Sequence, residues 1–394
     1  MQKKRTIGFM FKQINNVYEK EFNNRLRTLG ITASQCAVLD YLFDCEKEEV
    51  TQRDIEKGLN LRNPTVTGLL KRLDEKGYIL SVPSNTDKRC KNIYLTEKAY
   101  DIQRRMENQR RKLDKMLTIG MNKKEIEALI FVSQTPDYIL PATSCILQDR
   151  LGLSKNCMTL DISLGCSGWV HGIAALAGLM SGGCVKKALL LAGDGRKHTN
   201  EEPDQLFGMA GTATALEYKK GDKGFYFHMG TDGSGYDAII RPVGGTRNQL
   251  KAEDLELKMC EDGRMRHQLQ TRMKGMDVFS FAITTAPKSI KQLAEQYELS
   301  LNDVDYYVLH QANRMINEKI RAKLKQSEEK FPCSMMTFGN TSSASIPLTI
   351  ITQLAKETLE RTLSIIGCGF GVGLSWGTVY FELSNPIISK LVEL

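Results

Sequence analysis

The chain has 394 residues, of which 41% are apolar, enough for two or three domains with separate cores. Its apolar runs, such as Ala188 to Ala192, are too short to cross a bilayer, and the basic N-terminus lacks the apolar stretch of a signal peptide, which argues against a membrane or secreted protein. Ten cysteines without paired spacing are typical of a reducing compartment, so we expect a cytoplasmic protein that does not associate with membranes.

The formal charge of +8 is unevenly distributed along the chain. Residues 1–130 contain 26 Lys and Arg against 18 Asp and Glu, whereas the remainder contains 28 of each kind. Because binding to phosphates requires locally concentrated cations, only the first part is expected to meet a polyanion. A basic surface that is merely solvated is the alternative on charge alone.

Two helices are predicted early in the first part. ITASQCAVLDYLF places apolar residues at helical spacing from Ile31 to Leu42. VTQRDIEKGLNL follows, with Thr51 three residues before Asp54 in the pattern of a capping box. The flanking stretches Lys3 to Leu29 and Glu97 to Leu117 are also predicted to be helical.

A further helix is predicted in LRNPTVTGLLKRLDEKGYI. Asn63 can cap it, Pro64 suits its first position, and apolar residues from Val66 to Leu73 form one face. Polar and basic residues lie off that face, namely Thr65, Thr67, Lys71 and Arg72. A short helix, a turn and a second helix with a polar, basic outer side is the arrangement that enters a DNA major groove.

The segment YILSVPSNTDKRCKNIYLT predicts two short strands around a polar loop, a wing that carries Lys88, Arg89 and Lys91. With these elements, the first 125 residues or so resemble the MarR-type winged-helix regulators, in which an Asp-x-Arg pair of the wing orients an arginine toward the minor groove. Asp87 and Arg89 match that pair. The resemblance implies a twofold dimer that binds a palindromic DNA operator; a winged helix used for protein contacts is the alternative.

The residue pattern changes within KKEIEALIFVSQTPDY, residues 123–138, from one typical of a helix end to an apolar run typical of a strand. Downstream, TLDISLG and KKALLLAG predict strands, and Ala142 to Leu151 and Trp169 to Met180 predict helices between them. Such alternation is typical of a mostly parallel sheet. DVDYYVLH and GFGVGLSWGTVYFEL are predicted to continue this pattern.

A candidate nucleophile lies in DISLGCSGWVHG, where Cys166 falls between a predicted strand and a predicted helix and is flanked by small residues. Positive backbone dipoles at a helix N-terminus favour a thiolate, so we expect an activated thiol. A lone cysteine is more often buried and inert. Two further candidates are His310 in VLHQANRMI and Asn340 in FGNTSSASIP; each taken alone could be an ordinary strand-end or turn residue.

Together, these three stretches in this order resemble β-ketoacyl-[acyl-carrier-protein] synthase III, a thiolase-like family, from about Glu125 to Leu383. The resemblance implies that Cys166 takes an acyl group from acyl-CoA. His310 and Asn340 would then stabilise the enolate formed by decarboxylation of malonyl-carrier protein. It implies no cofactor or metal besides these substrates.

The same resemblance implies roles for residues around the reacting groups. Backbone N–H groups of Cys166 and of the turn near Gly371 and Val372 would hold an oxyanion. Asn313 would lie near the CoA arm. Gly275 and Phe279 would line the acyl tunnel, although Phe279 could equally belong to the core.

We therefore expect a mainly α winged helix-turn-helix domain at residues 1–125. An α/β thiolase-like (αβαβα) domain at 126–394 is expected to follow, lacking about the first 80 residues of the synthase family and therefore exposing a sheet edge. The expected assembly is a homodimer that contacts DNA, acyl-CoA and acyl-carrier protein. Three interpretations remain open: a DNA-binding condensing enzyme, a repressor whose thiolase-like part only senses acyl groups, and a gene-fusion accident with an impaired enzyme.

Overall fold

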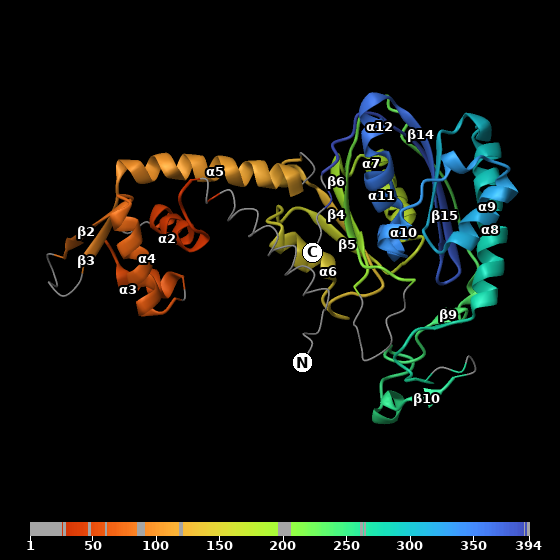
Figure 1. Cartoon of the computed structure of the whole chain (residues 1–394), viewed down its shortest axis with the longest axis horizontal. Coiled ribbons are helices and arrows are strands. Elements are labelled where there is room, and N and C mark those ends of the chain that lie inside the picture. The colour runs from red at the N-terminus through yellow and green to blue at the C-terminus, as the bar shows by residue number, and fades with distance from the viewer. Residues whose placement is uncertain are drawn as a thin grey trace. The chain divides into compact units, whose positions relative to one another are not determined.

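The computed structural model describes residues 26, 29–45, 49–59, 61–84, 91–117, 121–195, 206–260, 263, 265–389 and 391. The chain forms two compact units, and the boundary between them lies at Gly120 and Met121. Figure 1 shows the helices and strands of both units. No helix of the described segments combines the length and apolarity needed to cross a membrane.

In its described residues, the first unit contains three short helices, a small antiparallel sheet and one long helix. The sheet has the strand order β1-β3-β2. The elements are α2 (Ala33–Asp44), β1 (Val50–Thr51), α3 (Gln52–Gly58), α4 (Asn63–Glu75), β2 (Ile79–Pro83), β3 (Lys91–Leu95) and α5 (Glu97–Leu117). These elements confirm the helices and the strand pair predicted between Ile31 and Leu117. The predicted helix from Lys3 to Leu29 lies almost wholly outside the described residues.

The predicted capping interaction is present at the start of α3 and absent at the start of α4. The Asp54 carboxylate accepts from the backbone N–H of Thr51 at 3.0 Å, as a capping box requires. Asn63 does not cap α4, because Arg62 occupies the N-cap position and the Asn63 amide donates to Glu56 at 2.6 Å. The apolar face of α4 is buried as predicted, from Val66 to Leu73.

The first sheet of the second unit has the order β5-β4-β6-β7. Its strands are β4 (Ala128–Val132), β5 (Met158–Ile162), β6 (Lys187–Gly193) and β7 (Gly211–Glu217). β4 pairs in parallel with both β5 and β6, and only β7 runs antiparallel. All five residues of β4 are buried, as expected for a strand covered on both faces. The prediction of a mostly parallel sheet is confirmed here.

The second sheet has the order β13-β14-β15-β8. Its strands are β8 (Phe225–Thr231), β13 (Tyr306–Leu309), β14 (Leu363–Gly371) and β15 (Ser375–Leu383). Only the β13–β14 pair is parallel, because β15 turns back on β14 and β8 pairs antiparallel with β15. The expectation of parallel pairing was therefore wrong for this sheet: the short connection between β14 and β15 permits a hairpin only.

Helices separate and cover the two sheets (Figure 1). α7 (Gly168–Ser181) and α11 (Ser345–Thr349) lie between the sheets, and a single apolar cluster joins Trp169 of α7 to residues of both. α8 (Gly275–Gln296) and α9 (Arg314–Leu324) cover the outer face of the second sheet with a separate cluster. α6 (Thr143–Arg150) packs on β4 and β5. The result is a helix-sheet-helix-sheet-helix arrangement.

Candidate functional site

Cys166 lies in the connection between a strand of the first sheet and the central helix α7. β5 ends at Ile162 and α7 begins at Gly168, so the cysteine occupies the connection just before the helix. β14 approaches it closely: a Cβ added at Gly371 would lie 2.7 Å from Cys166 Cβ and 2.8 Å from its Sγ. A side chain at position 371 would displace the cysteine, which explains why glycine stands there.

The surroundings of Cys166 raise the pKa of its thiol, whereas a position at a helix N-terminus was expected to lower it. Burial of the thiol raises its pKa to about 11, and the nearby Asp194 carboxylate adds to this shift. The backbone N–H of Val372 and the Ser342 side chain contact the sulfur and act in the opposite direction. The position before a helix was expected to favour the thiolate, but desolvation outweighs the hydrogen bonds that stabilise the anion, and the net effect raises the pKa of the thiol. At neutral pH the resting group is the thiol.

His310 follows β13 and is 1% exposed. Its backbone N–H donates to the Cys368 carbonyl of β14 at 2.8 Å, and its Nδ1 lies 2.8 Å from Ser345 Oγ. Phe370 packs edge-on against the ring. Burial lowers the pKa of His310 to about 4, so the imidazole is neutral at pH 7.

Asn340 is held in a loop between α10 (Met335–Phe338) and α11. Its side-chain Oδ1 accepts from the Ser342 backbone N–H at 2.9 Å, and its backbone N–H donates to the Leu206 carbonyl at 2.8 Å. Ser342 adopts a left-handed backbone with φ of 53°, which is uncommon for a residue other than glycine. Because Oδ1 is occupied, Nδ2 is the end of the amide left to donate to a ligand.

The segment from Asn340 to Ser345 brings the three candidates together. Ser342 contacts the Cys166 thiol through its side chain and Asn340 through its backbone, and Ser345 contacts His310. Sequence reasoning did not assign roles to Ser342, Ser345 or Asp194. The unusual density of Gly, Ser and Thr in GNTSSAS was the available signal for the two serines.

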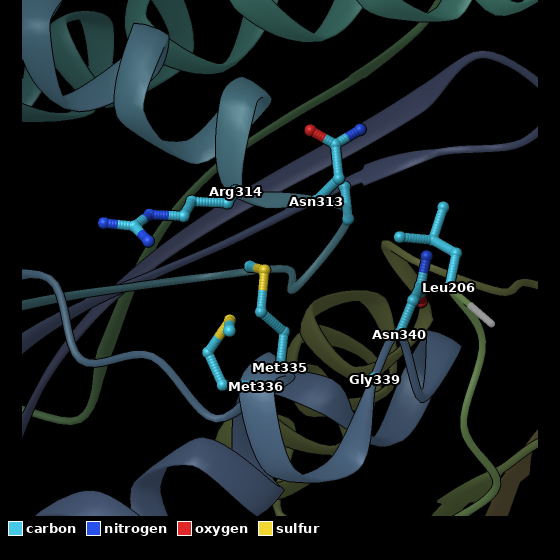
Figure 2. A pocket seen from close by; sticks show the side chains of 8 residues that line it. Leu206, Asn313, Arg314, Met335, Met336, Gly339 and Asn340 are labelled. Atoms are coloured by element: carbon cyan, nitrogen blue, oxygen red, sulfur yellow. The ribbon is translucent and has the colours of Figure 1, made fainter.

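A cavity of about 210 Å³ opens beside Asn340. Figure 2 shows Met335 and Met336 of α10 on one side, Asn313 and Arg314 at the start of α9 on another, and Leu206 next to Asn340. Asn313 is also the N-cap of α9, since its Oδ1 accepts from the backbone N–H of Ile316 at 2.8 Å.

The predicted tunnel residues Gly275 and Phe279 do not line this cavity. Both lie in the first turns of α8, where Gly275 is exposed and Phe279 packs against the outer cluster of the second sheet. The alternative of a core position for Phe279 fits this packing.

In the first unit, the four predicted DNA-contacting residues of α4 are exposed on the side opposite its buried face: Thr65, Thr67, Lys71 and Arg72. The Thr67 hydroxyl accepts from Gln52 of α3 at 2.8 Å, which ties the two helices together. Asp87, Lys88 and Arg89 lie outside the described residues.

Gly371→Ala should disturb the site, because the added methyl group would overlap the Cys166 side chain, and overpacking of this kind costs about 1–3 kcal/mol. We expect a lower melting temperature and a changed rate of Cys166 alkylation. Gly178→Ala in α7 is the matched control: nothing lies within 4 Å of its added Cβ, so it should stabilise the helix by up to about 1 kcal/mol. Equal effects of the two substitutions in thermal unfolding would contradict the close packing.

Comparison with known protein families agrees with the division of the chain. Residues 160–233 match the family 3-oxoacyl-[acyl-carrier-protein] synthase III, and residues 294–383 match its C-terminal model. Residues 20–106 match the transcriptional regulator family SarA/Rot. The regulator match therefore concerns SarA/Rot proteins and not MarR proteins specifically.

Individual relatives agree with the assignment of the second unit. The β-ketoacyl-[acyl-carrier-protein] synthase III of Clostridioides difficile is 31% identical over 261 residues, covering 65% of this chain and 76% of that protein. The enzyme of the same name from Clostridium tetani is 32% identical, covering 67% and 79%. The crystal structure of a 3-oxoacyl-(acyl-carrier protein) synthase from Burkholderia xenovorans superposes with a TM-score of 0.64 at 34% identity, covering 71% and 80%. The chain therefore belongs to the 3-oxoacyl-[acyl-carrier-protein] synthase III family.

Proposed function

We propose that the second unit is a condensing enzyme that forms an acyl thioester on Cys166 and extends it with a malonyl unit. The observation that carries this proposal is the short segment from Asn340 to Ser345, which contacts the thiol, fixes the Asn340 amide and holds His310. A nucleophile and two hydrogen-bonding side chains joined in this way suit thioester chemistry.

In the first stage, the Cys166 thiol loses its proton and attacks the acyl-CoA carbonyl, and CoA leaves as the thiol. The backbone N–H of Val372, which already contacts Sγ, is placed to stabilise the negative charge on the carbonyl oxygen. Gly371 keeps this backbone close to the sulfur. The Cys166 N–H is the second donor proposed for this oxyanion.

In the second stage, malonyl-carrier protein enters and loses carbon dioxide, and the resulting enolate attacks the acyl-Cys carbonyl. The bond to the sulfur then breaks, which releases the ketoacyl-carrier protein and returns Cys166 to the thiol. Asn340 Nδ2 donates to the enolate oxygen, and His310 supports the same stage. The cavity beside Asn340 accepts the thioester arm, with Asn313 at its rim. Gly275 and Phe279, in the first turns of α8, would line the path of an acyl chain that extends from Cys166 toward this helix.

The experiment that tests this function separates the two stages. Purified protein is incubated with acetyl-CoA and analysed by intact mass, and malonyl-carrier protein is then added and the ketoacyl product measured. An acetyl adduct that disappears as product forms supports the proposal. A folded protein that gains no adduct from acyl-CoA thioesters of several chain lengths contradicts it.

We propose that the first unit is a winged helix of the MarR type that binds a palindromic operator. α4 supplies the recognition face with its exposed Thr65, Thr67, Lys71 and Arg72. In the segment between β2 and β3, Asp87 would orient Arg89 toward the minor groove, and Lys88 would add positive charge beside it. The excess of positive charge in residues 1–130 agrees with this assignment.

Replacing both Lys71 and Arg72 by Ala should weaken binding to DNA and flatten its salt dependence. Each lost phosphate contact lowers the slope of log affinity against log salt by about 1, so the double variant should lose about 2. Fluorescence anisotropy with a duplex selected from a random library measures both quantities. Lys155→Ala, an exposed lysine of the second unit, is the control. An unchanged slope in the double variant would contradict the α4 interface, and unchanged affinity of Arg89→Ala would contradict the wing contact.

We further propose that the protein is a homodimer joined through β5, an edge strand of the first sheet. Met158 and Leu160 are 42% and 40% exposed on one face of this strand, and exposed apolar edges favour pairing between chains. Leu160→Lys should therefore shift the protein toward monomer in light scattering at micromolar concentration. Leu359→Lys, at another exposed leucine, should not. A wild-type monomer at that concentration would refute the dimer.

A reducing compartment, and hence the cytoplasm, is the proposed location. All nine cysteines among the described residues are free thiols, including the solvent-exposed Cys145, Cys184 and Cys333.

A further inference from the structure

Asn63 is the first residue of α4, and its exposed side chain does not cap the helix. Its Nδ2 donates instead to Oε1 of Glu56 on α3 at 2.6 Å. The same carboxylate oxygen accepts from Gln52 Nε2 at 2.9 Å. Two amide side chains, one from each helix, therefore meet at one carboxylate where α3 packs against α4 (Figure 1).

This carboxylate fixes which end of each amide faces it. A carboxylate oxygen only accepts, so Gln52 and Asn63 must turn their NH₂ groups toward Glu56 and their oxygens away from it. In the opposite orientation, Asn63 Oδ1 and Glu56 Oε1 would face each other at 2.6 Å with lone pairs only, which is repulsive. Glu56 thus sets the orientation in which the Asn63 amide meets a ligand.

Gln52 and Thr67 have already given away the hydrogens of their side chains. Gln52 Nε2 gives one hydrogen to Glu56 and the other to Thr67 Oγ1, which lies at 2.8 Å. The Asn63 carbonyl oxygen is a longer contact of the same Nε2, at 3.4 Å. That carbonyl oxygen accepts the hydroxyl hydrogen of Thr67 at 2.9 Å. Among the described residues, no group engages Asn63 Oδ1 or its second Nδ2 hydrogen.

We propose that Asn63 is a base-reading residue of the first unit and that it reads adenine. This inference rests on the proposed DNA-binding function, in which α4 enters the major groove, where the N-terminal residues of a recognition helix meet base edges. Adenine presents there an N6 amino donor and an N7 acceptor. The Asn63 side chain offers the complementary pair, an acceptor at Oδ1 and a donor in the second Nδ2 hydrogen.

Glu56 is the positioning residue in this arrangement, because it disfavours guanine at the same place. Guanine presents two acceptors in the major groove, N7 and O6, so a bidentate contact requires two donated hydrogens. One Nδ2 hydrogen of Asn63 is already given to Glu56. Its Oδ1 would then face a guanine acceptor with lone pairs only.

Selection of duplexes from a random library by the wild-type protein tests the proposal. Fluorescence anisotropy then compares the selected duplex with duplexes in which one base pair at a time is replaced. The site should contain an A·T pair whose replacement by G·C weakens binding by about 5- to 150-fold, the range for a bidentate contact to a base. Asn63→Ala should lose the discrimination at that pair and keep it at all other positions.

Lys71→Ala is the matched control on the same helix. It removes a proposed phosphate contact, so it should weaken binding to all duplexes alike and lower the salt slope by about 1. Asn63→Ala should leave that slope unchanged. Discrimination by Asn63→Ala that equals the wild type at every base pair overturns the proposal, and so does a loss of discrimination at a G·C pair of the selected site.

Glu56→Ala tests the positioning role. It allows the Asn63 amide to turn both hydrogens toward guanine, so the penalty for G·C at the adenine position should fall. Glu56→Gln should restore the penalty, because a glutamine oxygen still accepts from both amides. The ratio of affinities for the two duplexes is the measured quantity, since loss of the negative charge strengthens binding to both duplexes in both variants. An unchanged ratio in a folded Glu56→Ala protein refutes the role of Glu56.

Failure of the proposed function would give a different result. A folded wild-type protein that selects no duplex from the library refutes sequence-specific DNA binding, and this inference with it. Selective binding with a salt slope that Lys71→Ala lowers, but with a base preference that Asn63→Ala leaves unchanged, refutes this inference alone.

Discussion

Cys166→Ala should abolish the mass increase that the protein shows after incubation with acetyl-CoA. The substitution removes the sulfur that forms the thioester and nothing else of comparable nucleophilicity stands in its place, because Ser342 at its side carries a neutral hydroxyl. Alanine also fits the space below Gly371 without overlap, since it is smaller than cysteine. The loss should therefore occur in a normally folded protein, as judged by its melting temperature.

The control for this experiment is Cys145→Ala, which removes an exposed thiol from α6. Reagents that acylate thiols indiscriminately would modify the exposed Cys145 more readily than Cys166, which is only partly exposed. If acetyl-CoA labels the wild-type and Cys145→Ala proteins equally but not the Cys166→Ala protein, Cys166 is the nucleophile. Labelling that persists in Cys166→Ala refutes this assignment.

Asn340→Asp should retain acylation of Cys166 and lose condensation with malonyl-carrier protein. The aspartate keeps the size of the side chain and an oxygen to accept from the Ser342 N–H, but it cannot donate as Nδ2 does. Loss of one donor to a developing oxyanion lowers a rate by about 10²–10³-fold. Single-turnover measurements of each stage separate the two effects, and His310→Ala is expected to show the same division between the stages.

The matched comparison is Asn340→Ala, which removes both the donor and the acceptor. If the donor is what matters, the Asp and Ala variants should lose condensation to a similar extent. Asp retaining the wild-type condensation rate would contradict the proposed role of Nδ2. Loss of acylation in both variants would instead indicate that the loop around Ser342 had moved away from Cys166.

Much of the fold could be predicted from local patterns. The predicted helices in the first unit and the strands around β4, β5, β6 and β13 correspond to elements of the structure, because apolar spacing and turn residues act over a few neighbours. The start of α4 was predicted to within one residue, but the capping role given to Asn63 was wrong, since its side-chain amide donates to Glu56 of α3. Likewise, the pairing of β8 with β15 depends on a strand far away in the chain.

For the candidate site, too, some features could be predicted from the sequence and others depend on the tertiary structure. By itself the sequence determined which residue types are available, a cysteine before a helix, a histidine after a strand and an asparagine in a Gly/Ser/Thr-rich loop. Their surroundings come from segments distant in sequence. Gly371 and Val372 lie against Cys166, and the Asp194 carboxylate opposes ionisation of its thiol. Ser345 contacts the His310 ring. Protonation depends on burial and on neighbours in space, which only the tertiary structure decides. For that reason the raised pKa of Cys166, which opposes the effect of its position before a helix, could not be known before the fold.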